Sequence, residues 1–214
     1  MQQFLKRRIE LSRRLLANDP EVHYADLVLI LTAVLSACAA VRWPSTKKER
    51  IDTPRFVELL VTASPADARA GYISVPALVR AGLASEAQTP WSKLGKSTRI
   101  YTGEEIDCDL DSAVIAFPSV SKKVLKRYSY ACLIYQWIRC GYSHEYCASE
   151  ELTEVPPSHR RTQVSYIGGS AKCSETVRMA HFHLEYLIDL ADHHVTTLPD
   201  HALARPKEWW LNVA

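Results

Sequence analysis

Residues 27–41 read LVLILTAVLSACAAV, a run without a charged side chain between Asp26 and Arg42. A helix that spans a bilayer needs about 20 consecutive apolar residues, and this run is shorter and rich in alanine, serine and cysteine. Small side chains let neighbouring helices approach closely. The run therefore predicts a central helix packed on all sides in a helical protein, and we expect no membrane-spanning segment.

Apolar residues recur at intervals of three and four in residues 4–16 and 119–142, which is the pattern of an amphipathic helix. The segments that we predict to be helical are 4–16, 21–42, 54–62, 75–83, 119–142 and 183–194. Thr53 and Ser74 each precede a predicted helix with a proline in its first turn, a usual arrangement at a helix start. The chain is thus predicted to be mainly α.

The remaining segments show no helical period. Residues 84–118 predict an irregular insertion, with a short strand at 99–101. Residues 163–167 alternate as a strand does, and residues 168–170 (GGS) signal a turn. A second strand from about Thr176 completes a hairpin, but a helix that starts at Ser174 fits the same pattern. We expect one domain over residues 1–214, a helical bundle with a small β-hairpin and the irregular insertion.

The composition is that of a globular protein, with 47% hydrophobic and 23% charged residues. A net charge of +2 means that nucleic acid would have to bind at a local basic patch. Phosphate-binding glycine motifs are lacking, and the six cysteines form no C-x-x-C pair. There is no secretory signal at the N-terminus. We therefore expect no metal, no cofactor and a reduced, cytoplasmic protein.

The densest basic cluster in the sequence stands in the first turns of the predicted helix 119–142. Its members are Lys122, Lys123, Lys126 and Arg127. Because lysine and arginine side chains neutralise phosphates, the cluster is a candidate RNA-binding surface. A solvated helix face is the alternative interpretation.

Arg139 and His144 stand near the end of the same helix, in the stretch YQWIRCGYSHE of residues 135–145. In an unbroken α-helix, residues five positions apart point about 140° away from each other. We expect Gly141 to permit a helix end or distortion that turns His144 towards Arg139. An imidazole can act as general acid or base on a ribose hydroxyl, and a guanidinium can clamp a phosphate. The pair therefore indicates RNA cleavage without a metal ion.

These residues, at the end of an aliphatic and aromatic helix, resemble the HEPN superfamily, whose ribonucleases carry an arginine and, a few residues later, a histidine. The resemblance covers residues 119–145. It implies a metal-independent endoribonuclease, a toxin or phage-defence effector, with Arg139 and His144 as catalytic residues. It also implies RNA as substrate, a homodimer in which two such pairs meet, and an antitoxin or regulatory protein as a partner. Some members are non-catalytic binding or scaffold modules, which is the alternative function.

Two other features bear on this choice. Family members commonly have a polar residue after the arginine, where this chain has Cys140. Arg178 and His183 repeat the spacing of the first pair, but no glycine stands between them. We therefore prefer Arg139 and His144 as the candidate site.

Overall fold

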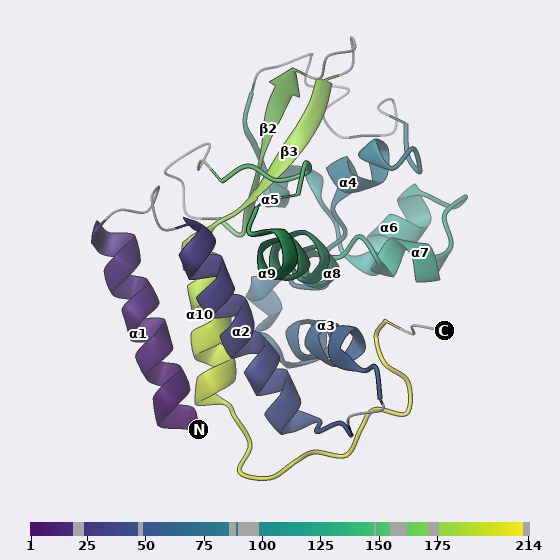
Figure 1. Cartoon of the computed structure of the whole chain (residues 1–214). Helices are drawn as coiled ribbons and strands as arrows, with labels where there is room; N and C mark the ends of the chain where they lie inside the picture. Colours follow the sequence, from purple (N-terminus) through teal and green to yellow (C-terminus); the bar gives the residue numbers. More distant parts are fainter. Residues whose placement is uncertain are drawn as a thin grey trace.

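The computed structural model describes residues 1–18, 24–46, 49–85, 89, 99–147, 149–154, 162–170 and 176–211. The described chain is mainly helical and carries one small antiparallel sheet at one end (Figure 1). The predicted fold class, mainly α with a small β element, is confirmed at this level.

The described chain forms α-helices, a 3₁₀ turn, a π-helix and three strands. The α-helices are α1 (Gln2–Asn18), α2 (Tyr24–Arg42), α3 (Asp52–Ala63), α4 (Val75–Arg80), α5 (Gly103–Ile106), α6 (Leu110–Ala116), α7 (Lys122–Lys126), α8 (Tyr130–Leu133), α9 (Gly141–Glu145) and α10 (Leu184–Thr196). A 3₁₀ turn, η1 (Ala66–Ala68), follows α3, and a π-helix, η4 (Ile134–Cys140), joins α8 to α9. The strands are β1 (Tyr101–Thr102), β2 (Val164–Ser170) and β3 (Thr176–Phe182), with β2 in the middle of the sheet.

The apolar helix α2 packs against α1, α3, α9, α10 and η4. Leu27, Leu31 and Leu35 on its inner side are fully buried. By length and composition α2 could cross a membrane, and half of its apolar window is buried inside the fold. The prediction of packing on all sides is wrong, because the opposite side of α2 is exposed or half-buried at Leu29, Ile30, Ala33, Ser36, Ala37 and Ala40.

The predicted hairpin is confirmed. Strands β2 and β3 pair antiparallel, with Tyr166 opposite Ala180, and β1 adds a short third strand opposite Tyr166. Helix α10 begins directly after β3, so the alternative of a helix from Ser174 is wrong. The predicted turn at 168–170 is also wrong, because these residues continue β2; residues 171–175 lie outside the described residues.

The predicted continuous helix over 119–142 is wrong. It breaks after α7, because the segment that precedes α4 competes for its backbone groups. Ser74 N donates to the Tyr128 carbonyl at 2.9 Å, and Tyr130 N donates to the Tyr72 carbonyl at 2.9 Å. These bonds between distant parts of the sequence replace helical hydrogen bonds, so α7 and α8 are separate helices.

The prediction of irregular structure at 84–118 is wrong for residues 101–116, which form β1, α5 and α6. Acidic residues cap these short helices. Asp109 Oδ1 accepts a hydrogen bond from Ser112 N at 2.9 Å, and Glu105 Oε2 accepts one from Thr102 N at 2.8 Å. The predicted strand at 99–101 overlaps β1 only at Tyr101. Residues 86–88 and 90–98 lie outside the described residues.

A half-buried carboxylate, that of Asp107, joins α4, α8 and β2. Asp107 Oδ2 accepts hydrogen bonds from the hydroxyls of Tyr130 at 2.5 Å and Tyr166 at 2.6 Å, and Oδ1 accepts one from Val75 N at 2.9 Å. Ser74 shares a 2.8 Å hydrogen bond with Tyr166. Burial raises the pKa of Asp107 to about 7 against the lowering effect of these hydrogen bonds. The network thus fixes the sheet to the helices below it.

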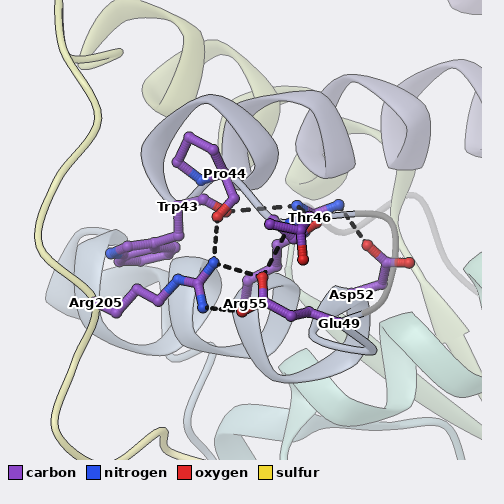
Figure 2. Close-up of polar contacts among 8 residues, drawn as sticks. Trp43, Pro44, Thr46, Glu49, Asp52, Arg55 and Arg205 are labelled. Carbon is purple, nitrogen blue, oxygen red and sulfur yellow. Dashed lines mark hydrogen bonds and ion pairs between the residues drawn. The ribbon is translucent and has the colours of Figure 1, made fainter.

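The chain after α10 returns over the end of α2 and the start of α3 (Figures 1 and 2). Arg205 contacts both carboxylate oxygens of Glu49, at 2.9 and 2.8 Å, and donates to the Pro44 carbonyl at 2.6 Å. The Arg205 hydrogen bond lowers the pKa of Glu49 to about 2. Trp209 packs edge-on against Trp43 with 5.6 Å between ring centres. These contacts hold the C-terminal segment against the helices.

Two buried histidines predict a loss of stability in acid. His194 Nε2 lies 2.9 Å from Ser64 Oγ, and His183 Nε2 lies 2.8 Å from Ser165 Oγ. Burial lowers the pKa of His194 to about 3 and that of His183 to about 4. Below pH 6.5 the unfolded chain binds protons at both residues and the folded chain does not. Between pH 7 and pH 5 each histidine should therefore cost about 2 kcal/mol of stability.

Urea unfolding of the wild type and of His194→Gln at pH 7 and pH 5 measures this effect. The variant should lose about 2 kcal/mol less than the wild type on acidification. Asp107 has the opposite effect on stability, because its raised pKa stabilises the fold as the pH falls. This effect is the same in both proteins, so it cancels when they are compared. An identical change in both proteins would contradict the assignment to His194.

Candidate functional site

Arg139 lies in the last turn of η4 and lines an open pocket against the half-exposed side of α2. The pocket has a volume of about 550 Å³, and its wall consists of Leu29, Ile30, Thr32, Ala33, Ser36, Arg139 and Ser143. The guanidinium carbon lies 5.1 Å from the ring centre of Tyr135, and Nη1 lies 4.0 Å from Cys140 Sγ. Arg139 is thus a half-buried cation on the wall of a largely apolar pocket.

The helix does not end at Gly141, where φ is −54° and ψ is −58°. There it changes from the π winding of η4 to the α winding of α9, and it ends at Tyr146, whose φ is 52°. A distortion is present as the π-helix before Gly141, but it does not bring His144 to the pocket of Arg139 as expected. Glycine is needed for another reason: a Cβ at this position would lie 3.0 Å from the Cys147 carbonyl oxygen, which folds back over α9.

His144 is exposed on α9 and is not among the residues that line the Arg139 pocket. Ser143, four residues after Arg139, is the α9 residue on the pocket wall. One chain therefore presents the two predicted catalytic side chains separately, Arg139 from the pocket wall and His144 from the helix surface. Sequence reasoning missed Ser143, although its spacing from Arg139 is that of neighbours on one helix face.

Hydrogen bonds at both sides hold α9 in place. The Tyr142 hydroxyl donates to Glu154 Oε1 at 2.6 Å. The Tyr146 hydroxyl donates to Asp26 Oδ1 at 2.6 Å and so joins the end of α9 to the start of α2. The helix that carries His144 is thereby fixed relative to the helix that lines the Arg139 pocket.

The four predicted RNA-binding cations lie in or next to α7, apart from the helix of Arg139. Lys122 Nζ lies 3.1 Å from Asp111 Oδ1 in an exposed ion pair. Lys126 Nζ lies 4.7 Å from the ring centre of Trp210 and is half-buried. Lys123 and Arg127 are exposed. Because the helix ends after α7 and α8 is a separate helix, this cluster and Arg139 do not lie on one continuous helix.

The second pair with the same spacing does not form a solvent-facing site. Arg178 on β3 lies over the ring of Tyr101, with its guanidinium carbon 4.5 Å from the ring centre. His183 is buried and shares a hydrogen bond with Ser165. A substrate in solvent therefore does not reach this imidazole, and the preference for Arg139 and His144 stands.

Metal-ligating side chains are dispersed in the part of the chain that the structure describes. No three His, Cys, Asp or Glu side chains there are grouped so that they could hold a metal ion. The described cysteines, Cys38, Cys108, Cys132, Cys140 and Cys147, are free thiols. Cys173 lies outside the described residues.

The chain matches no protein-family model, no curated protein and no solved structure. Its function is therefore argued from its own residues and their geometry.

Proposed function

We propose that this protein is a metal-independent endoribonuclease of the HEPN type. The observation that carries the proposal is a π-helical distortion that places Arg139 on the wall of an open pocket and is followed directly by the helix that exposes His144. Short π-helical turns occur frequently at functional sites. An exposed imidazole and a guanidinium open to solvent are the groups that cleavage of a phosphodiester requires.

The proposed reaction uses the ribose of the substrate as its nucleophile. A base removes the proton from the 2′-hydroxyl, the 2′-oxygen attacks phosphorus, and the bond to the 5′-oxygen breaks as an acid protonates that oxygen. The products are a 2′,3′-cyclic phosphate and a 5′-hydroxyl. His144 serves as the proton-transfer group, and Arg139 stabilises the charge on the phosphate. DNA is not cleaved, because it has no 2′-hydroxyl.

A homodimer would contain two copies of His144, so that one could act as the base and the other as the acid. The side of α2 beside the Arg139 pocket is apolar and open to solvent at Ala33, with Leu29 and Ile30 half-buried. Exposed apolar patches mark interaction surfaces. Contact between two copies along this side would bring two Arg139 side chains close together. The toxin or phage-defence role and an antitoxin or other regulatory partner are proposed on the resemblance alone. The cytoplasmic location is proposed from the cysteine pattern of the sequence.

Lys123 and Arg127 remain proposed contacts for the RNA backbone, since both are exposed. Lys122 and Lys126 contribute less to this proposal, because Asp111 and Trp210 already contact them.

One observation favours the alternative, a non-catalytic HEPN-like binding or scaffold module. The pocket beside Arg139 is lined by apolar side chains and by the hydroxyl side chains of Thr32, Ser36 and Ser143, but not by His144. Cys140 stands where a polar side chain is common in the family. An apolar pocket with a cation on its wall is suited to binding.

Incubation of the purified protein with single-stranded RNA in EDTA distinguishes the two functions. The nuclease proposal predicts cleavage that persists in the chelator. RNA that stays intact at a high protein concentration would contradict it and would support the binding module.

A further inference from the structure

The first helix carries a local excess of positive charge. Helix α1 carries one acid, Glu10, and five basic residues: Lys6, Arg7, Arg8, Arg13 and Arg14. Its net charge is +4, whereas the whole chain has +2, so the rest of the chain has a net charge of −2. A polyanion is therefore attracted to α1 rather than to the molecule as a whole.

Most of these cations are available to a ligand. Arg13 pairs with Asp192 of α10 at 2.9 Å. Lys6, Arg7 and Arg14 are exposed, and no acidic partner of theirs is found among the described contacts. Arg7 and Arg14 are seven residues apart, so both lie on one side of α1, two turns from each other.

An aromatic side chain accompanies the cations. Phe4 is 54% exposed, and the Arg8 guanidinium carbon lies 4.7 Å from the centre of its ring. Proteins that bind single-stranded nucleic acids commonly combine exposed aromatic rings with arginine and lysine. The bases stack on the rings, and the phosphates contact the cations.

The charged side of α1 is its outermost side. Leu5 and Ile9 face the protein and are buried, and the helical repeat places Arg7 and Arg14 opposite them. A helix that lies on a membrane has apolar residues at this outermost position. The order of side chains on α1 thus favours a nucleic acid backbone over a lipid surface.

One helix, α2, separates α1 from the helices that carry Arg139 and His144. Helix α1 packs along α2, and α2 in turn packs against η4 and α9 (Figure 1). Packed helix axes are 8–10 Å apart, so the axes of α1 and α9 are separated by no more than about 20 Å. A strand of several nucleotides spans this distance.

We propose that the outer side of α1 is the main binding surface for single-stranded RNA, with Arg7 and Arg14 on phosphates and with a base stacked on Phe4, beside which the Arg8 guanidinium lies. The choice of RNA rather than DNA rests on the proposed function. The surface itself does not depend on cleavage, because none of its residues takes part in proton transfer.

The test measures binding of a fluorescent single-stranded RNA to the full chain carrying His144→Ala, which keeps the RNA intact. In this background Arg7→Gln with Arg14→Gln should weaken binding about tenfold at moderate salt and reduce the slope of log affinity against log salt by about 1.4. Phe4→Ala should weaken binding about tenfold through lost stacking. The matched control is Arg50→Gln with Lys207→Gln, which removes two exposed cations elsewhere and should change affinity less than about twofold.

Equal weakening by the α1 pair and the control pair would overturn the proposal. So would binding to vesicles of about four parts phosphatidylcholine to one part phosphatidylserine by a chain that leaves RNA unbound. The cleavage assay is read separately. A protein that binds RNA through α1 without cleaving it refutes the nuclease and keeps this surface, whereas a nuclease that binds equally well without Arg7 and Arg14 keeps its activity and loses this surface.

Discussion

Replacement of His144 by alanine should lower the rate of RNA cleavage by a factor of about 1,000, within the range that general acid–base catalysis contributes. The melting temperature should stay at the wild-type value, because His144 is exposed on α9 and makes no hydrogen bond among the described contacts. The measurement pairs single-turnover cleavage of a labelled RNA with thermal unfolding of the same preparations.

Arg139 gives a second, independent variant. Arg139→Lys keeps the positive charge and loses the two-pronged contact that a guanidinium makes with phosphate, so cleavage should fall less than in Arg139→Ala. Both variants also change the contact with Tyr135, so their melting temperatures are needed beside their rates. Ser143→Ala, on the same pocket wall, is the control and should cleave at close to the wild-type rate.

If His144→Ala cleaves RNA as fast as the wild type, the proposed role of this histidine is wrong. If His144→Ala is inactive but also melts at a much lower temperature, the histidine is structural and the alternative function gains support.

Gly103→Ala should destabilise the fold more than alanine at Gly71, Gly82 or Gly141, because its added methyl group has the closest contacts. A Cβ at Gly103 would lie 2.0 Å from the Tyr130 hydroxyl and 3.1 Å from Asp107 Oδ2. Tyr130 is buried, so its ring has to shift away from the added methyl group within the packed core. This shift breaks its hydrogen bond to Asp107. An unsatisfied buried polar group costs about 1–3 kcal/mol, and overpacking of a core costs about 1–3 kcal/mol. Chemical unfolding at neutral pH should therefore show a loss of about 2–6 kcal/mol.

Gly71→Ala provides the matched control. Its Cβ would meet Val61 Cγ1 at 3.4 Å, an ordinary contact distance, so stability should change by less than about 1 kcal/mol. Unfolding of both variants at the same urea concentration would show that the network around Asp107 is looser than its hydrogen-bond distances indicate.

The long helices could be predicted from the sequence because the hydrophobic pattern of each is local. Helices α1, α2 and α10 begin and end within a few residues of the predicted limits. The break between α7 and α8 could not be predicted, because the bonds of Tyr128 and Tyr130 to Ser74 and Tyr72 join residues far apart in sequence. The short helices α5 and α6 were missed because Glu105 and Asp109, which cap them, also fit a solvated loop.

The residues proposed for the candidate site come from the sequence, and their geometry could be predicted only in part. Arg139, His144 and a distortion near Gly141 follow from the sequence. The pocket wall does not, because α2 is apolar all round its middle and gives no sign of which side faces solvent. Packing of α1, α3 and α10 against α2 decides that Leu29, Ile30 and Ala33 face Arg139 instead of the core.

The chemical ends of the RNA products test the central claim most directly. A labelled single-stranded RNA is incubated with the wild-type protein in EDTA, and the termini at the cleavage position are identified by mass. We predict a 2′,3′-cyclic phosphate and a 5′-hydroxyl, with no cleavage when the nucleotide 5′ to the scissile bond lacks its 2′-hydroxyl. A 3′-hydroxyl with a 5′-phosphate, or undiminished cleavage of the deoxy-substituted substrate, would contradict the mechanism.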